Sequence, residues 1–152
     1  NADEIAKGLS PFRPEEVAVQ AGRLMLERID RLLARGETFA IETTLATRSY
    51  ARLVRRAKAV GYTVLLLFFW LPSPEMRVAQ RVAEGGHDIP REVIRRRYWL
   101  GLRNLLEIYA PEVDVWSMYD NGGPMRPIVD RNIVVDHDKF ARIKSLCQSK
   151  KK

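Results

Sequence analysis

Long apolar runs, paired cysteines and a phosphate-binding glycine loop are all missing from this sequence of 152 residues. The longest apolar run, residues 64–71, is far shorter than the roughly 18 residues that a membrane-spanning helix needs. The single cysteine, Cys147, excludes an intramolecular disulfide and fits the reducing cytoplasm, which is the compartment that we expect. No secretory signal opens the chain, and we expect no membrane partner.

What the sequence does contain is enough apolar material for a core and a surplus of positive charge. Hydrophobic residues make up 46% of the chain, which predicts one globular domain over residues 1–152. There are 26 basic residues against 19 acidic ones, so the formal net charge is +7. Such a surplus favours polyanionic partners, among them phosphates, nucleotides and nucleic acid, without choosing between them.

The hydrophobic pattern predicts strands that alternate with helices. Ser73 followed by Pro74 is typical of a helix start, because the hydroxyl can cap the helix and proline suits its first position. The alternation predicts an α/β fold with a largely parallel sheet and crossover helices. We expect strands at residues 38–43, 64–70, 113–119 and within 127–135, and helices at residues 17–34, 50–60, 74–83, 90–109 and 140–146.

Glu42, Thr43 and Thr44 follow directly on the apolar residues of the first predicted strand. Ligands of open parallel sheets bind beyond the carboxyl ends of the strands, so these three side chains are candidates for a binding cleft. The alternative is that Thr44 or Thr47 caps the next helix and that Glu42 is a solvated acid.

Arginines flank the Gly85–Gly86 hinge on both sides. Guanidinium groups bind phosphate oxygens in a bidentate way, and an arginine-bearing flap can stabilise charge on a transferring phosphoryl group. The alternative is an ordinary basic helix surface that contacts nucleic-acid phosphates loosely. The arginines concerned are Arg77, Arg81, Arg91, Arg95, Arg96 and Arg97.

Other titratable residues point to no metal site. His87 lies in the glycine hinge, and His137 stands between two aspartates at a predicted strand-to-helix corner. A metal site needs more ligands at defined spacing, so we predict none.

Five segments, taken together and in this order, resemble the zeta toxin-like P-loop kinases over about residues 1–130. They are Asn-Ala-Asp-Glu-Ile at 1–5, Leu-Ser-Pro-Phe at 9–12, Ile-Glu-Thr-Thr-Leu at 41–45, Leu-Pro-Ser-Pro at 71–74 followed by Arg81, and Gly-Gly-His-Asp-Ile-Pro at 85–90 with Arg-Arg-Arg-Tyr at 95–98.

The resemblance implies a kinase that transfers the γ-phosphoryl group of ATP to a hydroxyl of a small molecule, for the toxins themselves UDP-N-acetylglucosamine. Asp3 matches the aspartate that orients or deprotonates the accepting hydroxyl. Glu42 and Thr44, with Thr43 between them, match the element that holds the acceptor. Flap arginines reach the phosphates; the matching residues are Arg81 with Arg91, Arg95 or Arg96, and Arg95 is the first choice.

One departure from the family is large, because no Gly-Lys-Ser or Gly-Lys-Thr occurs in the chain. That loop cradles the phosphates of ATP and supplies a hydroxyl ligand to Mg²⁺. We therefore expect the chain to be part of a longer kinase and inactive alone. Without the first strand, its sheet should have a vacancy and an exposed apolar face.

The expected partners are ATP with Mg²⁺, a hydroxyl-bearing small molecule and, if the protein is a toxin, an antitoxin protein; nucleic acid is not expected. The alternative from another class is a basic binding module that performs no chemistry and docks nucleic acid or a protein.

Overall fold

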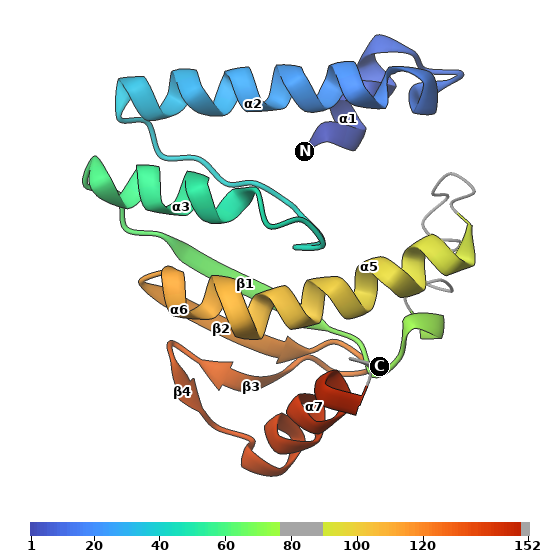
Figure 1. Ribbon diagram of the computed structural model, residues 1–152, viewed down its shortest axis with the longest axis vertical. Helices are drawn as coiled ribbons and strands as arrows, with labels where there is room; N and C mark the ends of the chain where they lie inside the picture. The colour runs from blue at the N-terminus through green and yellow to red at the C-terminus, as the bar shows by residue number, and fades with distance from the viewer. Residues whose placement is uncertain (77–89, 150–152) are drawn as a thin grey trace. The chain divides into compact units, whose positions relative to one another are not determined.

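The computed structural model describes residues 1–76 and 90–149, and the chain divides into two compact units, Asn1–Thr43 and Thr44–Lys152 (Figure 1). Each unit is described by itself below. Within the described residues, no helix is both long and apolar enough to cross a bilayer.

The first unit consists of α1 (Ala2–Leu9), the 3₁₀ turn η1 (Pro14–Val17) and α2 (Ala18–Arg35). The predicted helix at 17–34 is confirmed as α2, which ends at Gly36 in the left-handed conformation. Helix α1 was not predicted, although its capping signal is visible in the sequence. The Asn1 side chain accepts a hydrogen bond from the Glu4 amide at 2.9 Å, which is the usual N-cap arrangement.

The strand predicted at residues 38–43 is wrong. Residues 37–44 have no regular secondary structure. A strand is stable only when a neighbour accepts and donates its ladder of hydrogen bonds. All four strands of the described sheet lie later in the chain, and none of them pairs with this segment.

The sheet of the second unit has the order β1-β2-β3-β4 (Figure 1). Its strands are β1 (Leu65–Trp70), β2 (Val115–Asp120), β3 (Arg126–Asp130) and β4 (Ile133–Val134). Strands β1 and β2 are parallel, but β2 with β3 and β3 with β4 are antiparallel. The prediction of a largely parallel sheet is therefore wrong, because the connections after β2 are too short for the dozen or so residues of a parallel crossover.

The helices of the second unit follow the predicted positions closely. They are α3 (Tyr50–Ala59), α5 (Arg91–Asn104), the π-helical segment η2 (Leu105–Tyr109), α6 (Ala110–Glu112) and α7 (His137–Ser149). The Ser73 hydroxyl accepts a hydrogen bond from the Met76 amide at 3.2 Å, as expected at a helix start, and residues 74–76 are helical. The rest of the helix predicted at 74–83 lies outside the described residues.

The two faces of β1 have different environments. Leu66, Phe68 and Trp70 belong to or pack against the core, whose most buried members include Leu102, Leu105, Tyr109, Met118 and Ile128. On the other face, Leu65, Leu67 and Phe69 are 66%, 61% and 53% exposed. In the described part of the chain, β1 pairs with β2 alone. One face of β1 is therefore apolar and exposed.

Candidate functional site

Helix α5 is tied to the carboxyl end of β1 through Tyr98. The Tyr98 hydroxyl donates a hydrogen bond to the Leu71 carbonyl oxygen at 2.6 Å. Arg95 lies one turn earlier on the helix and forms ion pairs with Glu75 at 3.7 Å and with Glu92 at 3.8 Å. Because Glu75 follows the end of β1 by five residues, these contacts place Arg95 at the strand end where ligands of parallel sheets bind.

Burial of the Tyr98 ring raises the pKa of its hydroxyl to about 12 from the ordinary value of 10.0. A pKa raised by folding means that the neutral phenol stabilises the fold fully below pH 10, and that this contribution is lost as the pH rises towards 12. We expect the unfolding midpoint in urea to fall over this range, and to fall less in Tyr98→Phe. In Tyr119→Phe, which keeps Tyr98, the unfolding midpoint should fall as much as in the wild type. The same fall of the midpoint with pH in all three proteins would contradict this.

The loops that follow β1 and β2 contact each other. The Asn121 amide donates to the Trp70 carbonyl oxygen at 2.8 Å, and a Cβ on Gly122 would lie 2.7 Å from the Pro72 side chain. Burial alone would raise the pKa of Asp120 at the end of β2, but the Lys139 ammonium at 2.7 Å and the Gly122 amide outweigh it and lower that pKa. Sequence reasoning missed this ion pair, because 19 residues separate its members.

The turn that contains Thr44 packs on α5 and η2. The Thr44 carbonyl oxygen lies over Gly101, where a Cβ would approach to 2.2 Å. The buried amide of Asn104 donates to the Leu45 carbonyl oxygen at 2.8 Å. The Tyr109 hydroxyl donates to the Thr47 carbonyl oxygen. Thus one helical segment binds two carbonyl groups of the loop in which the acceptor-binding residue was predicted, and it leaves room for a third.

In the first unit, the two predicted acidic residues belong to segments that are bonded together. The Asn1 amide donates to a Glu42 carboxylate oxygen at 2.6 Å, across 41 residues of sequence. Asp3 is exposed in the first turn of α1. Glu42 is also exposed, as the alternative of a solvated acid expects, and the helix that carries Asp3 begins beside it.

The remaining predicted residues divide as follows. Thr43 belongs to the first unit, and Thr44 and Arg95 belong to the second. Arg91 and Arg96 are exposed on α5, whereas Arg81 lies outside the described residues. The Thr47 hydroxyl is 2.9 Å from that of Ser49 and accepts from the Ser49 amide at 3.2 Å, so it shapes the turn before α3.

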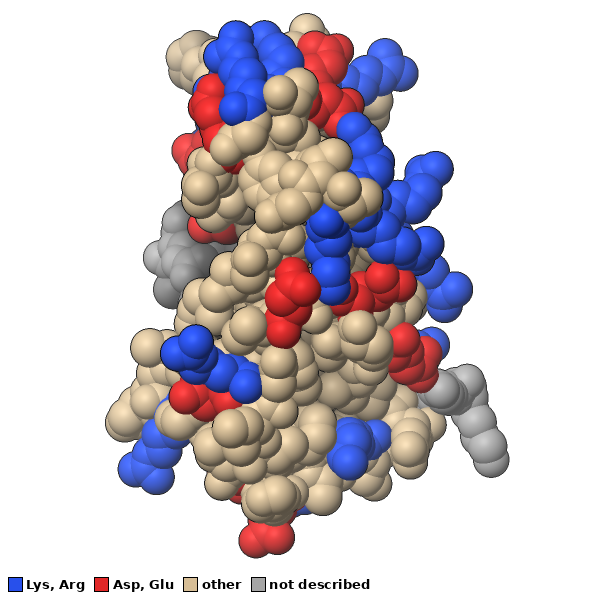
Figure 2. Space-filling view, turned by 90° about the vertical axis from the view of Figure 1, so that its left-hand side faces the viewer, with Lys and Arg blue, Asp and Glu red and all other residues tan. Residues whose placement is uncertain are grey.

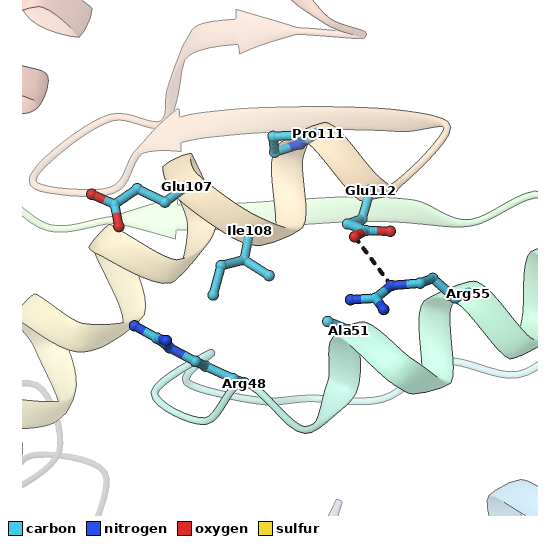
Figure 3. A pocket seen from close by; sticks show the side chains of 7 residues that line it. All are labelled: Arg48, Ala51, Arg55, Glu107, Ile108, Pro111 and Glu112. Carbon is cyan, nitrogen blue, oxygen red and sulfur yellow. Dashed lines mark hydrogen bonds and ion pairs between the residues drawn. The ribbon is translucent and has the colours of Figure 1, made fainter.

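The described residues of the second unit also form surface hollows elsewhere, and none of the predicted site residues lines the two that follow. One, of about 410 Å³, lies between the start of α3 and the η2–α6 segment, where Arg55 and Glu112 form an ion pair at 3.1 Å (Figure 3). The other, of about 630 Å³, is lined by residues that include Arg126, Asp136 and His137.

Some of the basic side chains of α3 form ion pairs with acidic side chains of the same unit. Arg55 pairs with Glu112, and Lys58 pairs with Asp114 at 3.0 Å. In the space-filling view, basic side chains gather at the level of α3 with acidic ones next to them (Figure 2). Among the described residues, no group of three or more His, Cys, Asp or Glu side chains could hold a metal ion.

Comparison with known proteins gives one distant relative. A protein of Haemophilus influenzae, described as uncharacterized, is 28% identical over 101 residues, which cover 64% of this chain and 72% of that protein. No family model matches the chain. No solved structure matches it.

Proposed function

We propose that the chain belongs to a P-loop kinase that phosphorylates a hydroxyl of a small molecule, such as a nucleotide sugar of the UDP-N-acetylglucosamine type. In the reaction, the acceptor oxygen bonds to the γ-phosphorus of ATP while the bond from that phosphorus to the bridging oxygen breaks, and ADP leaves. Asp3 orients the acceptor and takes its proton. Glu42, Thr43 and Thr44 hold the acceptor, and Arg95 with Arg81, Arg91 and Arg96 balances the phosphate charge.

The observation that carries the proposal is the position of α5. This helix holds the Thr44 turn through Gly101 and Asn104, and it contacts the end of β1 through Tyr98. Its first two turns carry Arg91, Arg95 and Arg96. Thr44 and the arginines were predicted from separate stretches of the sequence. The turn with Thr44 packs against the same helix that carries the arginines, which supports a common role.

The nucleotide itself requires a P-loop, which supplies the phosphate cradle and the Ser or Thr ligand of Mg²⁺. We assign no residue of this chain to Mg²⁺. The first test is therefore the coding sequence upstream of Asn1. A strand followed by Gly-x-x-x-x-Gly-Lys-Ser/Thr directly before Asn1 would support the proposal, and a stop codon or an unrelated linker there would refute it.

The second test is transfer of labelled phosphate from ATP by the full-length protein. We expect label to appear in UDP-N-acetylglucosamine or in another hydroxyl compound of a metabolite extract. A protein that binds nucleic acid instead, with an affinity that falls steeply as salt rises, would favour the basic binding module.

Arg95→Ala in the full-length protein should raise KM for ATP by about 10- to 100-fold, since a charge-assisted hydrogen bond contributes roughly 1.5–3 kcal/mol. Arg95 first has to exchange its contacts with Glu75 and Glu92 for phosphate oxygens. The control is Arg52→Ala on α3, another exposed arginine on a helix, which should leave KM within twofold. Equal effects of the two substitutions would show that only net charge matters.

A further inference from the structure

The Thr44–Thr47 loop contains an unusual backbone conformation. Leu45 has a φ of 55°, although it is not glycine. The left-handed region is unfavourable for a bulky side chain, and such residues persist only where their surroundings hold them. The Leu45 side chain is also buried in the core, at 6% exposure. The backbone of the loop is therefore strained at Leu45, and the surrounding residues hold it in one conformation.

The groups that hold this conformation come from a single stretch of helix. Asn104 is 3% exposed, and its amide nitrogen donates to the Leu45 carbonyl oxygen at 2.8 Å. The loss of this donor would remove a buried hydrogen bond from the backbone of the strained residue. Gly101, one turn earlier, leaves room for the Thr44 carbonyl oxygen, and the Tyr109 hydroxyl donates a hydrogen bond to the Thr47 carbonyl oxygen.

We infer that Asn104 is a positioning residue for the acceptor-binding loop: it fixes the strained Leu45 turn on α5 and thereby sets the direction of Thr44. This inference rests on the proposed function for the role of Thr44. The contact between Asn104 and the loop does not depend on the proposed function. Asn104 touches neither substrate nor nucleotide in this proposal. It acts through the backbone of the loop.

The first experiment measures the loop alone and requires no enzymatic activity. Arg48 is exposed next to the held carbonyls, so trypsin can test whether the bond after it is accessible. Asn104→Leu keeps the size of the side chain and removes the donor; it should increase the rate of cleavage after Arg48 at least tenfold, relative to cleavage after the exposed Arg35 at the end of α2 in the first unit. Asn104→Gln keeps the donor and should restore much of the protection.

A control variant separates this effect from general destabilisation. Ser117 is also 3% exposed, and its hydroxyl oxygen accepts a hydrogen bond from the Arg131 amide at 2.9 Å. The Ser117 hydroxyl also donates to an Asp130 carboxylate oxygen at 3.4 Å, so Ser117→Ala removes two part-buried hydrogen bonds of the second unit without touching the loop. It should lower the unfolding midpoint as Asn104→Leu does, yet leave cleavage after Arg48 unchanged. Equal acceleration of that cleavage by both substitutions would overturn the inference.

The second experiment measures kinetics in the full-length protein with UDP-N-acetylglucosamine, or with the acceptor found in the extract. Asn104→Leu should raise KM for the acceptor about tenfold and leave KM for ATP unchanged, whereas Ser117→Ala should change neither. Gly101→Ala, which pushes on the Thr44 carbonyl, should reproduce the change in acceptor KM. A rise in the KM for ATP alone would overturn the inference.

The two proposals can fail separately. If the wild-type protein transfers no phosphate to any compound, the proposed function fails, and the trypsin result still decides whether Asn104 holds the loop. If transfer occurs but Asn104→Leu changes neither the acceptor KM nor the cleavage rate, the kinase proposal stands and the role of Asn104 is refuted.

Discussion

Asp3→Asn in the full-length protein is expected to lower kcat for phosphoryl transfer by about 10²- to 10⁴-fold, the usual contribution of a general base. An amide keeps the size of the side chain and can still form hydrogen bonds, but it cannot accept the acceptor's proton. Affinity for ATP should stay the same, because Asp3 has no contact with the nucleotide in the proposed mechanism. Turnover with labelled ATP and a separate nucleotide-binding titration measure the two quantities.

The matched control is Glu4→Gln. Glu4 is the neighbouring acid in the first turn of α1, and its carboxylate pairs with Lys7 at 2.8 Å. Both substitutions remove one negative charge from the positive end of the same helix, so their costs in helix stability should be small and similar. Glu4→Gln should keep kcat within twofold. If Asp3→Asn does the same, Asp3 has no part in the chemistry.

Leu105→Ala is expected to destabilise the second unit by about 2–5 kcal/mol, since it leaves a cavity in a packed core. Leu105 has no exposed surface and lies in the same cluster as Met118 and Ile128. Tryptophan fluorescence during urea unfolding can measure the change, because Trp70, Trp99 and Trp116 all belong to this unit.

Leu67→Ala is the control of the same residue type. Leu67 is in the middle of β1 but 61% exposed, so its truncation should cost less than about 0.5 kcal/mol, as is usual on a surface. A cost close to that of Leu105→Ala would mean that this face of β1 is covered in solution and would contradict the exposure described above.

The elements of the second unit could be predicted because their signals are local. Strand β1 is one apolar run between Gly61 and Pro72, and α5 follows Pro90 with an apolar residue at every third or fourth position. The direction of strand pairing was harder to predict. It depended on the short connections from β2 to β3 and from β3 to β4. In the second of these, Arg131 and Asn132 both have positive φ, as a tight hairpin turn requires.

The strand predicted at residues 38–43 shows where local signals fail. Its composition is rich in residues that favour strands, but composition says nothing about whether a neighbouring strand is present. The candidate site has the same limitation. The positions of Glu42 and Thr44 suggested a binding cleft, and the arginines such as Arg95 suggested a phosphate site. By contrast, the contacts of Asn104 with Leu45 and of Asn1 with Glu42 each join residues more than 40 positions apart. Nothing in the sequence near Asn104 indicates this role.

The π-helical turn at Leu105–Tyr109 changes the direction in which the side chains after α5 point. Asn104 and Tyr109 can therefore both reach the same loop, at Leu45 and at Thr47. An α-helix rotates by about 100° per residue, and a π-turn accommodates one residue more than an α-turn. Gly101 and Asn104 are oriented by the α-helical part, while the wider turn resets the direction of Tyr109 towards Thr47. Deletion of one residue within this turn would restore a uniform α-helix and rotate Tyr109 away from Thr47. The extra residue of η2 therefore sets the rotation of Tyr109 relative to Asn104, so that both side chains reach the same loop.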